Sequence, residues 1–298
     1  MPVDQYLEFE NRFRGSAELV RRRLAIYDGL LAQWATHKML IRALDLGCGR
    51  GEWLQTLDRR GWQLTGVDQS PEMLAQARIG LSGEVQLVSA DLTAFLAQCP
   101  DGSVDLLTLF HVIEHMDAGH QQAVIREAHR VLADGGLLIC ESPNCENVRV
   151  ATHDFWIDPT HVRPLPPRLA QYWASVAGFD SAEVIGLQEN DWLHAAARIT
   201  TSDVMDGSSR DFALIALKGK TLAERIHVPA CFSGLRPLTA EALAARQSDE
   251  LDHGMMKLEQ RLGALEQTVQ AVYQSRSWRV TAPLRWLSDR FRSLLGRD

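Results

Sequence analysis

The chain has 298 residues, of which 46% are apolar, an ordinary fraction for a globular protein with a buried core. Its net charge of −7 argues against a general nucleic-acid-binding protein, and no apolar run approaches the roughly eighteen residues that cross a bilayer. Its five cysteines are scattered without a CxxC pair, and the first residues lack an apolar signal segment, which predicts a cytoplasmic protein without a disulfide framework.

Most of the chain carries the pattern of an α/β domain. Residues 1–40 are expected to form an N-terminal helical cap. Between residues 41 and 220, short apolar runs alternate with helical patterns, as is typical of βα units around a parallel sheet. The expected strands are 41–47, 62–68, 85–91, 103–110, 136–142, 181–187 and 211–219. The expected helices are 51–60, 70–80, 92–98, 118–132 and 167–177. Glycines in "ADGG" are expected to cap the helix that ends at residue 132.

The pattern changes after a mixed linker at 221–247. Within 248–274, apolar residues recur at alternating steps of four and three, the heptad pattern of a coiled coil. These residues are Leu251, Met255, Leu258, Leu262, Leu265, Val269 and Val272. A coiled coil implies a homo-oligomer, whereas the alternative is a single amphipathic helix packed on the main domain.

Residues 275–298 form a basic amphipathic tail. Between 276 and 298 the tail has six arginines against two aspartates, interleaved with tryptophan, leucine and phenylalanine. Such a combination suits the anionic surface of a membrane. The alternatives are a solvated helix end and an oligomer contact.

A glycine-rich turn, "ALDLGCGRGEW" (43–53), joins the first expected strand to the first helix of the α/β pattern. Gly47 and Gly49 allow a ligand to approach the backbone, next to the free N–H groups of a helix N-terminus. Asp68 ends the second strand, about twenty residues further on, where a carboxylate can accept both hydroxyls of a ribose. Asp91 ends the third strand, in a position to meet an adenine amino group.

The motifs "DLGCGRG", "GVDQSPEML", "SADL", "FHVIEH" and "EAHRVLADGGLLICESPN" together resemble, in order and spacing, class I S-adenosylmethionine-dependent methyltransferases. The resemblance covers about residues 40–220 and implies a Rossmann-like sheet of seven strands, the last antiparallel, with helices on both faces. It also implies S-adenosylmethionine as the cofactor, with Asp68 at its ribose. The other candidates are Asp45, Gly47 and Gly49 at the methionine end, Asp91 and Leu92 at the adenine, and Cys48, Gln69 and Phe110. Arg14 is a candidate partner of the cofactor carboxylate, the alternative being an ordinary surface arginine.

The stretch "FHVIEHM" (110–116) spells H-x-x-E-H, which on a long helix would suggest a zinc peptidase. Here it follows the fourth strand, at the sheet edge where a methyl acceptor would bind, so we exclude the peptidase. A similar E-H pair occurs in quinone-biosynthesis O-methyltransferases, which need no catalytic metal. That resemblance implies that Glu114 shapes the pocket or caps the helix, and that His115 is a base or a buried polar group.

A second resemblance is to small-RNA terminal-ribose methyltransferases, which bind a metal at this point. It implies a metal site of His111, Glu114 and His115, completed by His161 from the loop that follows. His111 stands where that family has glutamate, and such a donor set favours Mn²⁺, Fe²⁺ or Zn²⁺ over Mg²⁺. Both readings remain open from the sequence.

The loop "FWIDPTHVRPLPP" (155–167) is stiffened by prolines and lies beside the expected site. Trp156 suits a sugar ring and Arg163 a phosphate or carboxylate, while His161 is the candidate general base or last metal ligand. The loop is therefore either a functional lid or a stiff connector.

The two ends of the chain, "EFENRFRGS" and "YQSRSWRVTAPLRWL", resemble bacterial polysaccharide-cluster proteins. This implies methylation of a terminal sugar hydroxyl, or its phosphate, on a cell-surface glycan such as O-antigen or its lipid-linked precursor. Residues 248–298 would then meet polysaccharide-assembly proteins and the inner face of the cytoplasmic membrane. The alternatives are a small-molecule (quinone-like) or RNA-terminal ribose O-methyltransferase, and a catalytically weak coiled-coil scaffold. RNA fits poorly with the acidic body of the chain.

Overall fold

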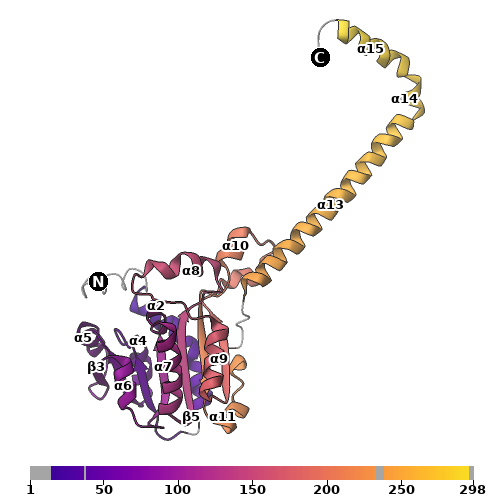
Figure 1. Cartoon of the computed structure of the whole chain (residues 1–298). Coiled ribbons are helices and arrows are strands. Elements are labelled where there is room, and N and C mark those ends of the chain that lie inside the picture. The colour runs from indigo at the N-terminus through magenta and orange to yellow at the C-terminus, as the bar shows by residue number, and fades with distance from the viewer. Residues whose placement is uncertain (1–14, 37, 233–237, 295–298) are drawn as a thin grey trace. The chain divides into compact units, whose positions relative to one another are not determined.

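The computed structural model describes residues 15–36, 38–232 and 238–294 (Figure 1). The chain divides after Leu243 into two compact units, 1–243 and 244–298. The first unit is built around one mixed sheet, and the second consists of helices, so each is described by itself.

The sheet of the first unit has seven strands in the order β3-β2-β1-β4-β5-β7-β6. Neighbours from β3 to β5 are parallel, and β7 is antiparallel to both β5 and β6. The strands are β1 Arg42–Leu46, β2 Gln63–Asp68, β3 Gln86–Ser89, β4 Val104–Phe110, β5 Leu132–Pro143, β6 Ser181–Leu187 and β7 Asp211–Leu217. The predicted Rossmann-like sheet with an antiparallel last strand is confirmed.

Helices cover both faces of the sheet, because side chains of each buried strand alternate between two apolar cores. In β4, Leu106 belongs to one core and Leu107 to the other. The first core is covered by α2 Ala17–Leu24, η1 Ala25–Tyr27, α3 Asp28–Ala35, α4 Glu52–Asp58 and α5 Pro71–Ile79. The second is covered by α6 Leu92–Gln98, α7 Ala118–Val131 and α9 Pro167–Ala177.

The predicted glycine cap of α7 is wrong. The helix ends at Val131, Leu132 is already extended, and the segment "ADGG" lies within β5, with Gly135 at φ 75°. The carbonyl groups that a cap would satisfy are bound instead by Lys218, whose Nζ donates to the carbonyls of His129 and Leu132 at 2.7 and 2.6 Å. The observed strand therefore begins at Leu132, before the predicted start at residue 136.

Short helices occupy the remaining connections of the first unit. They are η2 Ile113–His115, α8 Val148–Thr152, η3 Asp154–Ile157, η4 Asp191–His194, α10 Thr201–Asp206, α11 Lys220–Arg225 and α12 Val228–Cys231. The last two fall in the range expected as a linker, where Ile226, Val228 and Phe232 are buried in the first core. The start of that range is therefore packed rather than extended.

The C-terminal part of the chain is helical: α13 Ala240–Gln274, α14 Arg276–Val280 and α15 Ala282–Leu294. Helix α13 begins within the expected linker and runs through the whole predicted heptad segment. The seven apolar heptad side chains are between 43% and 64% exposed. Among the described residues, no helix is both long and apolar enough to cross a membrane.

Candidate active site

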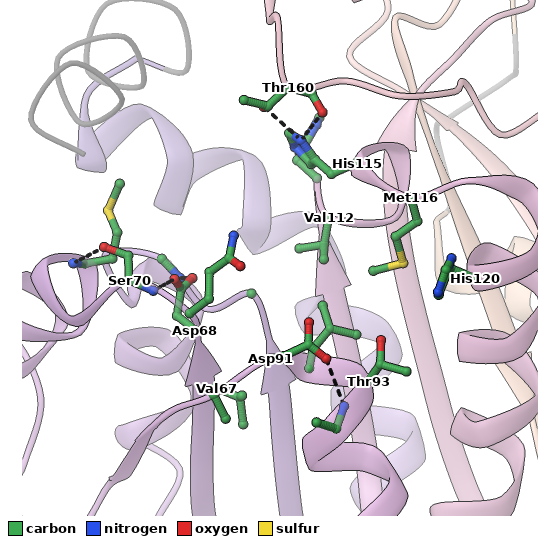
Figure 2. A pocket seen from close by; sticks show the side chains of 18 of the residues that line it. Val67, Asp68, Ser70, Asp91, Thr93, Val112, His115, Met116, His120 and Thr160 are labelled. Carbon is green, nitrogen blue, oxygen red and sulfur yellow. Dashed lines mark hydrogen bonds between the residues drawn. The ribbon is translucent and has the colours of Figure 1, made fainter. Parts of the chain in front are cut away.

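A cavity of about 1250 Å³ opens at the carboxyl edge of the sheet, above β1, β2 and β4. Figure 2 shows Asp68, Asp91 and His115 around this one opening. Eight of the residues predicted from the sequence line the cavity. They are Gly47, Gly49, Asp68, Gln69, Asp91, Leu92, His111 and His115. The structure thus brings the predicted cofactor turn, the two strand-end acids and the histidines of "FHVIEHM" to one place.

The glycine turn is held by its own backbone and by the acid that ends β2. Gly47 and Gly49 have φ of 68° and 51°, a left-handed conformation that favours glycine. A Cβ at Gly47 would lie 2.3 Å from Cγ2 of Val112, so the turn packs directly against the "FHVIEHM" stretch. Asp68 accepts hydrogen bonds from the N–H groups of Gly49 and Ser70, both at 2.9 Å. These bonds fix the carboxylate at the cavity wall.

Asp91 has a structural role that the sequence reasoning missed. Its Oδ1 accepts a hydrogen bond from the N–H of Ala94 at 2.9 Å, which makes it the N-cap of α6. The signal was available, because an aspartate directly before a helical pattern is a standard capping residue. The cap holds Asp91 at the rim of the cavity, beside Leu92 and Thr93 (Figure 2).

Three predicted cofactor residues lie behind the cavity wall rather than on it. Asp45 is buried, and its Oδ1 accepts a hydrogen bond from Thr108 at 2.7 Å. Cys48 is buried as well, and burial raises the pKa of its thiol. The ring of Phe110 packs against Trp53 at 5.0 Å between centroids. These residues support the turn from within, and Arg14 lies outside the described residues.

As predicted, the "FHVIEHM" stretch does not form a long helix. His111 adopts a left-handed conformation with φ 56°, and only Ile113–His115 form a single turn of 3-10 helix. The structure divides the stretch between two clusters of possible metal-binding side chains. We call Glu114, His115 and His161 the two-histidine group, and His111, Glu141 and Asp211 the carboxylate group. His111 is therefore grouped apart from His115 and His161, although its Nδ1 lies 3.3 Å from Oε1 of Glu114.

In the two-histidine group, both imidazole rings are oriented by backbone carbonyls. The Nδ1 of His115 lies 3.2 Å from the carbonyl oxygen of Thr160 and 3.0 Å from its hydroxyl. That hydroxyl donates to Asp158 at 2.6 Å, so it can only accept from His115. The Nδ1 of His161 lies 2.6 Å from the carbonyl oxygen of Phe155. In both rings Nδ1 therefore carries a proton, and Nε2 is the nitrogen that these bonds leave for a ligand.

Burial keeps the two-histidine group suited to a base or a metal. The rings of His115 and His161 are 4.8 Å apart between centroids. Burial lowers the pKa of His161, against the opposing effect of the Glu114 charge. Glu114 is fully buried: its Oε2 accepts a hydrogen bond from Ser142 at 3.1 Å, and its Oε1 lies 3.3 Å from Nδ1 of His111. One possible ligand atom from each of Glu114, His115 and His161 lies within 4.8 Å of the other two.

In the carboxylate group, the imidazole of His111 is surrounded by acids. Its Nε2 lies 3.4 Å from Glu141 and 3.8 Å from Asp211, and its Nδ1 lies 3.3 Å from Oε1 of Glu114. Burial alone would lower the pKa of His111, but the carboxylates outweigh it and hold that pKa well above its usual value. Burial also raises the pKa of Asp211 to about 6. His111 is therefore held as a cation without a free lone pair.

Sequence reasoning missed three members of this network: Tyr27, Glu141 and Asp211. The hydroxyl of Tyr27, from η1, donates to Glu141 at 2.5 Å, and Gln188 donates to Asp211. The available signals were the acids at the ends of apolar runs, "LLICES" and "DFALIAL". Nothing local in the sequence shows that β5 lies beside β7, which brings these acids together.

The proline-rich loop is fastened to the site by main-chain bonds. The N–H groups of Val162 and Arg163 both donate to the carbonyl of Glu114, at 2.9 and 3.1 Å. Gln121 donates to the carbonyls of Ile113 and Arg163, both at 3.0 Å. Thr160 and Val162 line the cavity, whereas Trp156 and Arg163 are exposed and are not among its lining residues. The loop therefore forms a fixed wall.

The wall of the cavity suits S-adenosylmethionine. The glycine turn offers close approach to the backbone, Asp68 offers carboxylate oxygens, and Val67, Met73 and Leu92 offer apolar contacts. The volume exceeds what one drug-sized ligand occupies, which leaves room for an acceptor beside the histidines.

Comparisons with known proteins agree with this fit. Residues 44–140 match the family model "Methyltransferase domain". A "Ubiquinone biosynthesis O-methyltransferase" of Xanthomonas oryzae pv. oryzae is 35% identical over 105 residues, covering 35% of this chain and 43% of that protein. A protein of the same description from Pseudomonas aeruginosa is 26% identical over 172 residues, covering 50% of this chain and 68% of that protein. The matched part thus spans less than half the length of the Xanthomonas relative.

A solved structure is similar over a larger share of the chain. A SAM-dependent methyltransferase from Archaeoglobus fulgidus superposes with a TM-score of 0.61 at 26% identity, covering 72% of this chain and 99% of that one. One from Mesorhizobium loti, at 19% identity and a TM-score of 0.51, shares the fold. The sheet order, the cavity at its carboxyl edge and these matches show that the chain carries a class I S-adenosylmethionine-dependent methyltransferase domain.

Proposed function

We propose that this chain is an S-adenosylmethionine-dependent O-methyltransferase acting on a small hydroxylated molecule, with a quinone precursor as the model acceptor. One observation carries the proposal: the cavity joins the cofactor residues Gly49 and Asp68 to His115, whose Nδ1 is held by Thr160 so that Nε2 is left for the acceptor. The relatives named for ubiquinone biosynthesis support the same acceptor class. Transfer to a carbon or to an amine would make less use of such a base.

The residues of the chain would align the acceptor and take up its proton. The cofactor supplies a methyl group on a sulfonium, which is already activated for displacement, so alignment lowers most of the barrier. Asp68 and the glycine turn hold the cofactor end of the cavity. His115 accepts the proton of the acceptor hydroxyl at Nε2 as the new O–C bond forms, while Thr160 holds Nδ1–H in place.

The two-histidine group also fits a divalent metal ion. Carbonyl oxygens that hold Nδ1–H leave Nε2 for a metal, which is a common arrangement for histidine ligands. Glu114, His115 and His161 each bring one possible ligand atom within 4.8 Å of the others, and Glu114 is fully buried. As the alternative to His115 acting as the base, we propose Mn²⁺, Fe²⁺ or Zn²⁺ at these three residues, without His111. Such an ion supplies one thing: it lowers the pKa of a hydroxyl bound to it.

A second candidate acceptor is a terminal sugar of a cell-surface glycan. The exposed side chains of α15 favour it, because Trp286, Leu287 and Phe291 alternate there with arginines. An anionic membrane surface that carries lipid-linked glycans suits such a helix, and the chain would then be a peripheral protein of that membrane. A terminal RNA ribose is a third acceptor, and a catalytically weak scaffold is the remaining alternative.

The test uses the full chain and labelled S-adenosylmethionine with three acceptor pools: a polyprenyl catechol, envelope glycolipids and an RNA oligonucleotide. Label in the catechol supports the proposal, and label only in glycolipid or RNA replaces the acceptor. Loss of label with EDTA, restored by Mn²⁺ or Zn²⁺, supports the metal, whereas insensitivity leaves a metal-free histidine base.

Two controls make the result interpretable. His115→Gln should abolish labelling, whereas His153→Gln should not, since His153 is exposed and outside the cavity. Failure of the wild-type chain to bind S-adenosylmethionine in a titration would favour the scaffold.

A further inference from the structure

Helix α13 carries an apolar stripe that is exposed among the described residues. Its members follow heptad spacing, and their exposed fractions range from 43% for Val269 to 64% for Leu251. They are Leu251, Met255, Leu258, Leu262, Leu265, Val269 and Val272. An ideal helix has 3.6 residues per turn, so a stripe that repeats every 3.5 residues stays in line only against another helix wound around it.

We propose that α13 pairs with α13 of a second copy of this chain, as a parallel two-stranded coiled coil over residues 251–272. The stripe itself indicates its binding partner, because it complements another stripe of the same spacing. The helix has 35 residues, about 50 Å at 1.5 Å per residue, so the whole heptad segment fits on one unbroken element (Figure 1).

Charges beside the stripe favour the parallel orientation. With Leu258 at heptad position d, Asp252, Glu259 and Glu266 occupy position e, and Arg261 occupies position g. In a parallel pair, g faces the following e of the other helix, so Arg261 meets Glu266 of the second copy twice by symmetry. In an antiparallel pair, e faces e, and the row of acids would meet itself. The charges of this segment therefore stabilise the parallel pair and destabilise the antiparallel pair.

The apolar positions favour two strands. Leucine occupies three of the four d positions, and β-branched Val269 occupies one a position. Leucine at d with β-branched residues at a is the combination found in parallel dimers. Trimers and tetramers prefer isoleucine at these positions, and the stripe contains none.

The first experiment measures the mass of the full chain in solution by light scattering and sedimentation over a range of concentrations. We expect a dimer that Leu258→Asp with Leu265→Asp weakens by at least ~100-fold, since each change places a carboxylate in the apolar seam. The matched control is Gln260→Asp with Gln267→Asp, on the opposite side of the helix, which should remain dimeric. A wild-type monomer or trimer, or a dimer that tolerates the seam variant, would overturn the proposal.

The second experiment decides the orientation. With the half-buried Cys99, Cys145 and Cys231 replaced by serine, Leu251→Cys should form a disulfide between copies on oxidation, because a parallel pair sets position 251 opposite itself. His253→Cys, on the outer side, should not. Arg261→Glu should weaken the dimer roughly tenfold, and Arg261→Glu with Glu266→Arg should restore it. A dimer that fails to cross-link through Leu251→Cys contradicts the parallel arrangement.

Discussion

The two-histidine group and the carboxylate group each take a histidine from the stretch 110–116 but surround it with different partners. His115 and His161 each donate Nδ1–H to a backbone carbonyl, which leaves Nε2 as the nitrogen for a ligand. His111 instead has a carboxylate within 3.4 Å of each ring nitrogen, which leaves it protonated. Two histidines four positions apart in the sequence therefore differ: His115 is suited to take up a proton, and His111 is suited to hold one.

The partner of each ring therefore decides its chemistry more than its spacing in the sequence does. Backbone carbonyls carry no net charge, so they orient an imidazole without charging it. Carboxylates stabilise the charged form, and burial strengthens their effect. We expect catalysis to depend on the two-histidine group and stability on the carboxylate group.

The largest expected effect separates the groups by activity. His115→Gln or His161→Gln should lower kcat by ~10²–10³, because the base or metal ligand is lost. The affinity for S-adenosylmethionine, measured by calorimetry, should change less than threefold. His111→Asn, which tolerates the left-handed conformation, should lower kcat by less than tenfold. Equal losses for all three variants would contradict the division.

The next effect is on the pH dependence of stability. The pKa of Asp211 is raised to about 6 in the folded protein, from 3.8, so the folded state binds this proton more tightly than the unfolded state. The free energy of unfolding should therefore fall as pH rises from about 4 to 6. Asp211→Asn removes this contribution, so its stability relative to wild type should increase by up to about 3 kcal/mol across that range.

Urea denaturation at pH 4, 5, 6 and 7 measures this difference. Asp249→Asn, at an exposed position, serves as the control and should follow the wild-type curve. If the Asp211→Asn curve runs parallel to wild type at every pH, the acid does not hold its proton as described.

A smaller effect concerns the hydroxyl that supports the carboxylate group from η1. Tyr27→Phe removes the hydrogen bond to Glu141 and leaves that buried carboxylate short of a donor. We expect a loss of about 2 kcal/mol in the free energy of unfolding. Tyr172→Phe, at a side chain that is 62% exposed, should leave the free energy of unfolding almost unchanged. Thermal denaturation of both variants and of the wild type measures the difference. An equal loss of stability in both variants would show that the Tyr27 hydroxyl does not stabilise the carboxylate group.

The smallest effect tests the orientation of His115. Thr160→Val removes the hydroxyl beside Nδ1 but keeps the carbonyl at 3.2 Å, so we expect kcat to fall only about threefold. Thr160→Ser should retain full activity. A loss as large as that of His115→Gln would mean that the hydroxyl contacts the acceptor directly.

The parts of the site that were predictable depend on local patterns. Each strand is a short apolar run, and Asp68 and Asp91 lie at strand ends, so alternation and spacing alone place them at one sheet edge. His115 was predicted for the same reason, since it follows β4. These predictions required only that the strands are parallel, and not which strands are neighbours in the sheet.

The parts that were missed depend on long-range packing. Glu141 and Asp211 meet His111 only because β7 lies between β5 and β6, and Tyr27 joins them because η1 packs on the first core. The grouping of His111 with Glu141 and Asp211 could not be predicted for this reason, because those two acids lie on strands far apart in the sequence, whereas Glu114, 3.3 Å from its Nδ1, is local. The glycine cap of α7 failed because Lys218, 86 residues further on, satisfies the same carbonyl groups.

The attachment of the proline-rich loop has a consequence for how this domain can change. The bonds from Val162 and Arg163 to the carbonyl of Glu114 involve only main-chain atoms, so almost any side chain can occupy these positions without moving the wall. The exposed side chains of Val162 and Arg163 can therefore vary freely while His161 stays in register with His115. If His115 accepts the proton as proposed, such a wall lets acceptor preferences change one substitution at a time while both histidines stay in place.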